Sequence, residues 1–385
     1  MPNERILVRG VNWLGDAVMS TPALFRLREA RRDAEIVLLT PRKLVGLWDR
    51  HPALDAVLAF SEEESVFRVA RRLRRERFST ALILPNSPRS ALEAFLAGIP
   101  ERIGYARPWR SFLLTRPVAA RTGETPMRKR SAREIQTLIR PSGQVQPTSF
   151  PASAHHIHQY LHLAAALGAN PDPLPPRLVV QPSEIEEARK RFGIDSQSGG
   201  SKRWFGLNPG ARYGSAKRWP QDRFVEAAIE IQKRTQCQWL IFGGEEDREF
   251  VTEMASALGR STSAARSGIE AASASVVNLA GRTTLRELCA LLQSCSVLVT
   301  NDSGPMHVAA AVGTPVVVLF GSTSPELTGP GLPENARSPH ILLRSPVPCA
   351  PCFRRTCPID LRCLRGITVP QVVEAALQAA GRARA

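Results

Sequence analysis

The chain has 385 residues, of which 43% are hydrophobic and 22% charged, with 26 Gly and 31 Pro. This composition excludes a mostly disordered chain, a collagen-like rod and a coiled coil. No apolar run approaches the roughly 18 residues that a membrane span needs. The N-terminal sequence MPNERILVRG lacks the apolar core and cleavage site of a secretory signal. We expect a globular, cytoplasmic protein whose length predicts two domains.

The charge is strongly positive, with 51 Lys and Arg against 35 Asp and Glu and a net charge of +16. Only 6 of the 51 cations are Lys. Three interpretations compete: nucleic-acid binding, attraction to an anionic membrane surface or acidic substrate, and an Arg-rich composition that only solvates the surface. Because the arginines are spread along the whole chain, charge alone does not separate these interpretations.

Short apolar segments alternate with helical ones in the N-terminal half. We expect strands at 6–8, 36–39, 56–58 and 81–84, and helices from about 17, at 68–77 and at 90–97. This alternation predicts a parallel sheet with helices on both faces. The stretch 118–150 is irregular and rich in Arg, Ser, Thr and Pro, and 155–167 is expected to be helical.

A linker at 171–176, with four Pro in six residues, precedes a second alternating series. Its strands are expected at 204–207, 239–242, 276–279, 297–300 and 316–320, and 196–202 is expected to form a surface loop. We therefore predict an α/β fold of two facing Rossmann-like domains, with ligands in the cleft between them. The predicted boundaries are 1–175, 176–345, and a Cys-rich segment with a C-terminal helix over 346–385.

Gly15 and Asp16 follow the first expected strand, where a helix begins. A carboxylate at this place suits a general base, and it equally suits a plain helix N-cap. The sequence G-V-N-W-L-G does not match the dinucleotide-binding pattern G-x-G-x-x-G, which argues against a dehydrogenase.

A Gly-rich loop opens the second domain and carries Lys217 and Arg218 before Pro220. Backbone N–H groups and a lysine would suit a diphosphate, although the loop does not match the Walker A pattern. The alternative is a long surface loop with two ordinary cations.

The richest polar segment follows the strand expected at 297–300. Asp302, Ser303 and Gly304 crowd the start of an Ala-rich helix, where the helix dipole and free N–H groups favour anions. His307 lies about one turn further and is expected to point toward the same opening, although a buried, satisfied His is the common alternative. A Ser-His-Asp triad is a poorer interpretation because the G-x-S-x-G elbow is missing.

Four of the seven Cys fall near the C-terminus, at Cys349, Cys352, Cys357 and Cys363. In a cytoplasmic chain such clustering suggests structural zinc more than disulfides, but the spacing is not a strong paired C-x-x-C form. A redox-labile pair and unliganded thiols remain the alternatives.

Five ordered motifs resemble those of the bacterial lipopolysaccharide heptosyltransferases, glycosyltransferase family 9. They are N-W-L-G-D-A-V-M-S-T at 12–21, L-P-N-S-P-R-S-A-L at 84–92, A-G-I-P-E-R-I-G-Y at 97–105, P-G-A-R-Y-G-S-A-K-R-W-P at 209–220 and N-D-S-G-P-M-H-V-A-A-A at 301–311. The resemblance covers nearly the whole chain, and the second and fourth motifs favour the members that add the second heptose.

The resemblance implies a GT-B fold and an inverting transfer that needs no catalytic metal or other cofactor. The implied donor is ADP-L-glycero-D-manno-heptose, and the implied acceptor is the first heptose of Kdo-lipid A. Asp16 matches the catalytic Asp and Lys217 the phosphate-binding Lys. Asp302, Ser303, Gly304 and His307 match a donor-binding motif, while Glu245 or Glu246 is a weaker candidate for the ADP ribose.

The acceptor side is inferred from charge. Arginines and one lysine in loops of the first domain suit an acidic acceptor, and the same charge suits peripheral attachment to the anionic inner face of the inner membrane. The candidates are Asn86 and Arg89, from the second motif, with Arg107, Arg110, Arg128, Lys129 and Arg130. For any single Arg, solvated surface is the simpler interpretation.

Two other enzymes and one non-enzyme class compete with this interpretation. Addition of the first heptose to Kdo-lipid A is the nearest alternative. A nucleotide-sugar 2-epimerase or another GT-B transferase fits the motifs less well. A basic nucleic-acid-binding protein is supported only by the charge, since no nucleic-acid-binding module is visible, and we expect no nucleic-acid partner.

Overall fold

The computed structural model describes residues 4–140, 150–194, 203–264, 276–332 and 338–382. The chain divides into two compact units. The first comprises Met1–Thr125 with Ser153–Val179, and the second comprises Pro126–Ala152 with Val180–Ala385. The loop expected at 196–202 lies outside the described residues.

The first unit is built on a six-stranded parallel sheet in the order β3-β2-β1-β4-β5-β6. Ile6, Leu7 and Val8 of the central strand β1 are all fully buried, as expected for a strand with both faces covered. The strands are β1 (Arg5–Arg9), β2 (Glu35–Pro41), β3 (Ala56–Phe60), β4 (Thr80–Ile83), β5 (Glu101–Tyr105) and β6 (Arg116–Val118).

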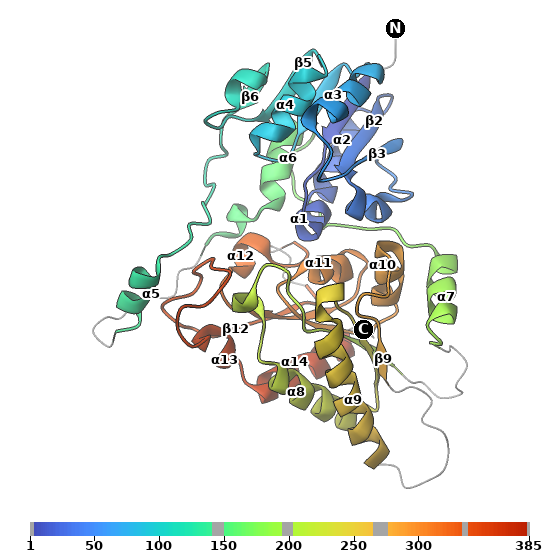
Figure 1. Cartoon of the computed structure of the whole chain (residues 1–385), viewed down its shortest axis with the longest axis vertical. Helices are drawn as coiled ribbons and strands as arrows, with labels where there is room; N and C mark the ends of the chain where they lie inside the picture. Colours follow the sequence, from blue (N-terminus) through green and yellow to red (C-terminus); the bar gives the residue numbers. More distant parts are fainter. Residues whose placement is uncertain (1–3, 141–149, 195–202, 265–275, 333–337, 383–385) are drawn as a thin grey trace. The chain divides into compact units, whose positions relative to one another are not determined.

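Helices cover both faces of this sheet. The chain moves from β1 outward to β3 and then returns to β4, so right-handed crossovers place α2 on one face and α3 with α4 on the other. Helix α6 packs beside α2, and α4 packs beside α3 (Figure 1). The helical elements are α1 (Leu14–Met19), α2 (Thr21–Ala30), η1 (Arg42–Trp48), α3 (Val66–Arg75), α4 (Pro88–Leu96), η2 (Ser111–Leu113) and α6 (Ile157–Ala165).

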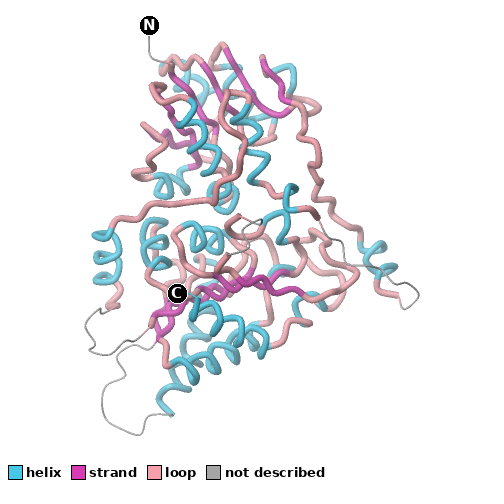
Figure 2. Tube along the Cα trace, turned by 180° about the vertical axis from the view of Figure 1, so that it is seen from behind, coloured by secondary structure: helices cyan, strands magenta, loops and turns pink. Residues whose placement is uncertain are grey.

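The second unit repeats the design with a six-stranded parallel sheet, and strands are magenta in Figure 2. The strand order is β12-β11-β10-β7-β8-β9. Its buried core runs from Phe205 and Trp239 on the sheet to Phe224 on α8 and Val372 on α14. The strands are β7 (Trp204–Asn208), β8 (Gln238–Ile241), β9 (Val276–Asn278), β10 (Leu298–Asn301), β11 (Val316–Phe320) and β12 (Ile341–Arg344).

The helical elements of the second unit connect and cover these strands. They are α5 (Ala132–Leu138), α7 (Pro182–Arg191), η4 (Ser215–Lys217), α8 (Gln221–Thr235), η5 (Glu245–Asp247), α9 (Arg248–Ala264), α10 (Leu285–Gln293), α11 (Gly304–Ala311), α12 (Pro325–Thr328), α13 (Arg362–Arg365) and α14 (Val369–Arg382), while η3 (Ala152–Ala154) spans the junction of the units. Among the described residues, no helix is both long and apolar enough to cross a membrane.

The two parallel α/β sheets confirm the predicted fold class. The sequence did not predict β5, β6 or β12, because these strands contain charged residues, Gly or Pro, and β12 alternates between half-buried and exposed residues. The sequence analysis expected Arg128, Lys129 and Arg130 in loops of the first domain. This expectation is wrong, because the segment that carries them packs with the second unit. There, the Arg130 N–H donates to the carbonyl of Cys352 at 3.0 Å.

Candidate active site

Asp16 lies in the first turn of α1, directly after the central strand β1. Trp13 is the N-cap residue of this helix, and its side chain makes no capping bond. Asp16 is therefore not the N-cap residue, and its carboxylate is half-buried. The strand order reverses between β1 and β4, which is where open α/β sheets bind ligands.

Two residues of the segment around α6 surround Asp16, and the sequence analysis named neither. The Tyr160 hydroxyl donates to Asp16 Oδ1 at 3.2 Å. Burial, reinforced by the Asp16 charge, raises the pKa of Tyr160 well above its usual range, so this group stays a donor. Burial lowers the pKa of His156, and the nearby Asp16 charge opposes that shift. A carboxylate that accepts a hydrogen bond from a buried phenol is held in a defined orientation.

The loop between β1 and α1 is anchored by a buried ion pair. Arg9, the last residue of β1, lies 2.8 Å from Glu93 of α4, and the two side chains are 3% and 1% exposed. The same guanidinium donates to the carbonyl of Gly10 at 2.5 Å and to Asn12 Oδ1 at 3.3 Å. Arg9 thus fixes the start of the loop that leads to Asp16.

The predicted donor-binding residues of the second unit come together in the structure. Lys217 Nζ donates to Asp302 Oδ2 at 2.6 Å, and the side chains are 13% and 4% exposed. Thr323 also donates to this carboxylate, and the ring of Tyr213 lies 4.9 Å from the Lys217 ammonium. Lys217 follows β7 and Asp302 follows β10, which are neighbouring strands, so both lie at the same edge of the sheet. Asp302 thereby holds the ammonium in place.

Side-chain amides join the loops after these two strands. Asn208 Nδ2 donates to Thr300 Oγ1 and to Ser303 Oγ, both at 3.0 Å. Asn301 accepts from the N–H of Trp219 at 3.0 Å and donates to the carbonyl of Pro209 at 2.6 Å. These bonds join the donor loop at 209–220 to the start of α11, so the two predicted motifs form one structural unit.

A second buried carboxylate supports the donor loop. Asp247 is 5% exposed, accepts from the N–H of Gly244 at 3.1 Å, and forms an ion pair with Arg218 at 3.2 Å. A Cβ at Gly210 would lie 2.1 Å from Asp247 Oδ2, so any larger residue there would have to displace this buried carboxylate. The sequence analysis missed Asp247. Its contacts with Arg218 and Gly210 form only because the loop after β8 folds against the loop after β7.

The remaining donor candidates differ in their surroundings. Ser303 is the N-cap residue of α11, and Gly304 is its first residue, so the free N–H groups of that helix start lie beside Asp302. His307 lies on the first turn and is 5% exposed. Glu245 is exposed in η5 and pairs with Arg248 at 2.7 Å, while Glu246 is exposed next to it.

The acceptor candidates of the first unit are mostly engaged by the protein itself. Asn86 is exposed after β4. Arg89 pairs with Glu93 at 3.0 Å and donates to the carbonyl of Glu64 at 2.5 Å, which gives it a scaffold role. Arg107 pairs with Glu124 at 2.6 Å. Arg110 is fully buried, donates to the carbonyl of Pro85 and is not a surface cation.

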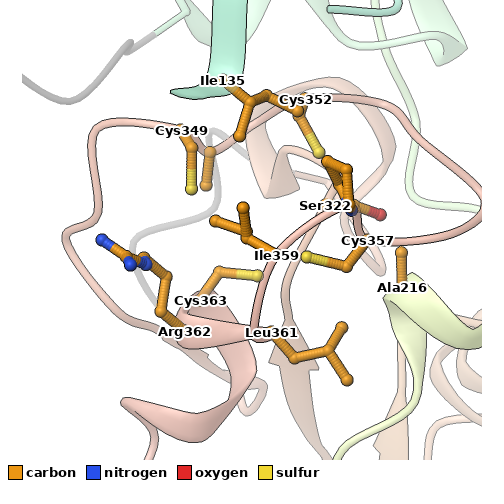
Figure 3. A pocket seen from close by; sticks show the side chains of 12 residues that line it. Ile135, Ala216, Ser322, Cys349, Cys352, Cys357, Ile359, Leu361, Arg362 and Cys363 are labelled. Atoms are coloured by element: carbon orange, nitrogen blue, oxygen red, sulfur yellow. The ribbon is translucent and has the colours of Figure 1, made fainter. Parts of the chain in front are cut away.

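The four clustered cysteines are thiols that line one small pocket with Ile359 and with Ile135 of α5 (Figure 3). Burial raises the pKa of Cys349 and Cys352, and raises that of Cys363 to about 12. Throughout the described part of the chain, no group of three or more His, Cys, Asp or Glu is arranged to hold a metal ion. In this arrangement the thiols pack as apolar groups, and structural zinc stays a prediction.

Comparison with known proteins identifies the family. The family model for glycosyltransferase family 9 (heptosyltransferase) matches residues 125–362. Lipopolysaccharide heptosyltransferase 2 of Escherichia coli K12 is 32% identical over 86% of this chain and 87% of its own length. Lipooligosaccharide heptosyltransferase 2 of Haemophilus influenzae is 30% identical over 84% of this chain and 85% of its own. The solved structure of E. coli ADP-heptose LPS heptosyltransferase II superimposes with a TM-score of 0.74 at 28% identity, over 99% of this chain and 100% of that one.

The fold, the polar cluster at the ends of β7 and β10, and these likenesses define a glycosyltransferase. The chain belongs to glycosyltransferase family 9, the heptosyltransferases. The family resemblance stated from the five motifs is thereby confirmed.

Proposed function

We propose that this enzyme transfers L-glycero-D-manno-heptose from ADP-heptose to the first heptose of the Kdo-lipid A inner core. The Lys217–Asp302 pair beside the start of α11 carries this proposal, because it fixes a cation at a helix N-terminus where a diphosphate would bind. The 32% identity to a protein named heptosyltransferase 2, over most of both chains, supports the choice of sugar and acceptor.

In this mechanism Asp16 is the general base. It would take the proton of the acceptor hydroxyl as that oxygen attacks the anomeric carbon, which inverts the anomeric centre. Tyr160 would orient the carboxylate. The first unit thus supplies the base, and the second unit binds the nucleotide.

Departure of ADP leaves negative charge on the diphosphate. Lys217 and the N–H groups at Ser303 and Gly304 are donors fixed in advance, which is the arrangement that stabilises developing charge well. We therefore propose that turnover needs no divalent metal. Glu245 or Glu246, exposed in η5 after β8, would accept from the ADP ribose.

The test measures ADP release by the purified protein from ADP-heptose with EDTA present, using either Kdo-lipid A or its mono-heptosylated form as acceptor. Release only with the heptosylated form is the expected result. Release only with bare Kdo-lipid A would instead assign addition of the first heptose, and loss of release on adding EDTA would contradict metal independence. A peripheral location at the inner membrane is part of the proposal, since the acceptor is a lipid and the chain carries a net charge of +16.

A further inference from the structure

One face of the first unit has an unusual outer surface, which is formed by α3, α4 and η2. Helix α3 packs along α4, and α4 contacts η2. Arg74 of α3 donates to the carbonyl of Leu96 at the end of α4 at 2.6 Å. Arg102 lies over the ring of Phe95 and donates to the carbonyl of Leu113 in η2 at 2.7 Å. These contacts make the three elements one continuous surface, which we call the α3–α4–η2 face.

Large aromatic side chains project from this face into solvent. Trp109, in the turn that leads into η2, is 85% exposed. Phe112 of η2 is 75% exposed, Phe67 of α3 73% and Phe95 of α4 44%. Trp109, Phe112 and Phe67 are the three most exposed large hydrophobic side chains in the described part of the chain. Exposed apolar groups gathered on one surface indicate a site of interaction rather than chance exposure.

The backbone of Trp109 indicates the same conclusion. Its φ angle is 67°, in the left-handed region that a bulky side chain rarely adopts. Its side chain gains little from packing, since most of it is exposed. Folding stability therefore does not account for an indole held outward on a strained backbone, whereas a binding role does.

Cations dominate the charge on the face, although Glu64, just before α3, pairs with Arg72 at 3.7 Å, and Glu62 and Glu63 are exposed beside it. Helix α3 carries five arginines, and all are exposed: Arg68, Arg71, Arg72, Arg74 and Arg75. The helix contains no acidic residue, and the single acid of α4, Glu93, is buried against Arg9. At the margins, Glu76 pairs with Arg5 at 3.3 Å and Glu101 with Arg116 at 3.4 Å. The face therefore presents cations and aromatic rings together.

We propose that the α3–α4–η2 face docks on an anionic phospholipid bilayer. Aromatic side chains at an interface insert among the headgroups, and arginines beside them bind acidic lipids. A second copy of the chain fits poorly, because a two-fold contact would bring the arginines of α3 against each other. The inference rests on the proposed function, which gives the enzyme a lipid-linked acceptor.

The position of the face suits that acceptor. Trp109 lies in the segment after the carboxyl end of β5, and Asp16 follows the carboxyl end of β1 in the same parallel sheet. Both residues thus lie toward the same edge of the sheet. Docking through Trp109 would bring the edge that carries the base toward the lipid surface.

The test is co-sedimentation of the full chain with vesicles that contain no sugar acceptor. One set combines phosphatidylethanolamine with phosphatidylglycerol, and the other is pure phosphatidylcholine. One variant combines Trp109→Ser with Phe112→Ser. A second combines Arg68→Gln, Arg71→Gln and Arg75→Gln. The matched control, Lys190→Gln with Arg260→Gln and Arg365→Gln, removes equally many exposed cations from the second unit.

We expect salt-sensitive binding of the wild-type chain to the anionic vesicles only. Each arginine on such a surface contributes about fivefold to partitioning, so the arginine variant should lose at least tenfold and the control little. The aromatic variant should lose a similar factor. Equal losses in the control would show that only net charge matters, and absence of wild-type binding would reject the site.

Self-association abolished by the aromatic variant, or tighter binding to single-stranded RNA than to vesicles, would assign the face to another partner.

Two further measurements distinguish failure of the docking site from misfolding of the variants and from failure of the proposed function. Circular dichroism melts must show that the variants fold like the wild type. ADP release with a deacylated, water-soluble acceptor should be unchanged in the variants, because the substitutions lie outside the residues assigned to catalysis. If the wild type binds vesicles but releases no ADP, the proposed function fails and the docking site stands. If it releases ADP and ignores vesicles, the docking site fails alone.

Discussion

Lys217 and Asp302, 85 positions apart, form a nearly buried ion pair at 2.6 Å. Each side chain neutralises the other in a region that excludes most water. Breaking a buried pair by removing one partner costs about 3–5 kcal/mol, because the remaining charge is left without compensation. The pair therefore stabilises the donor loop and, in the proposed mechanism, holds the phosphate-binding cation in position.

A double-mutant cycle separates these two roles. Asp302→Asn and Lys217→Met should each lower the free energy of unfolding by about 3 kcal/mol, and the double variant should recover part of that loss. Lys217→Met should also weaken ADP binding, and the double variant should not restore it. Denaturant unfolding and calorimetric titration of ADP measure the two effects. Additive stability losses would contradict the coupling.

Replacement of Asp16 should separate chemistry from nucleotide binding. Asp16→Asn keeps the shape of the side chain but cannot accept the acceptor proton, so kcat should fall by about 10²–10⁴-fold. ADP binding should remain unchanged, because Asp16 belongs to the first unit and the donor residues belong to the second. A variant with nearly normal kcat would remove Asp16 from the role of base.

Tyr160 is expected to act through Asp16. Its hydroxyl donates to the carboxylate at 3.2 Å from a buried position, so Tyr160→Phe leaves the packing and removes one hydrogen bond. We expect a several-fold lower kcat, unchanged ADP affinity and a loss of about 1 kcal/mol in stability. In a variant that already carries Asp16→Asn, the Tyr160→Phe change should have little further effect on kcat. Independent, multiplicative losses would mean that Tyr160 acts elsewhere.

The sequence predicted the two sheets and the polar loops at their strand ends, but not the partners across the fold. Lys217 and Asp302 were each predicted from local motifs, while their contact depends on β7 lying next to β10. Tyr160 was part of a predicted helix, and nothing in the local pattern shows that it reaches Asp16, 144 positions away. Arg89 stays an acceptor candidate, but the local pattern could not show its bonds to Glu93 and to the carbonyl of Glu64, because they form only when α4 folds against its neighbours.

A side chain at Gly210 should destabilise the donor loop. A Cβ there would lie 2.1 Å from a buried carboxylate oxygen of Asp247, so Gly210→Ala should cost about 1–3 kcal/mol and weaken ADP binding. The matched control is Gly259→Ala in α9, where nothing lies within 4 Å of the added carbon. Since alanine favours helix, this control should gain up to about 1 kcal/mol. Thermal melts of both variants provide the comparison, and a neutral Gly210→Ala would contradict the close approach.

Thiol reactivity tests the packing of the cysteines. All seven are free, and only Cys357 is partly exposed. Because burial also raises the pKa of Cys237 and Cys289 to about 12, these thiols contain little thiolate at neutral pH. We expect one thiol per chain to react rapidly with a disulfide reagent in the native state, and all seven after denaturation. Protection of Cys357 together with zinc release on denaturation would instead support the predicted zinc site.

Acid should destabilise the first unit through His51. Burial lowers the pKa of this imidazole from 6.5 to about 4. Between these two pH values the unfolded chain binds a proton at His51 that the folded chain does not. The contribution of His51 to stability is therefore constant above about pH 6.5 and is lost as the pH drops toward 4. The shift corresponds to roughly 3 kcal/mol. His51→Asn keeps an acceptor for the N–H of Ala53 but does not titrate, so its unfolding free energy should fall less steeply over this range. Denaturant melts of the two proteins at several pH values measure the difference, and parallel curves would show that His51 is not the titrating group.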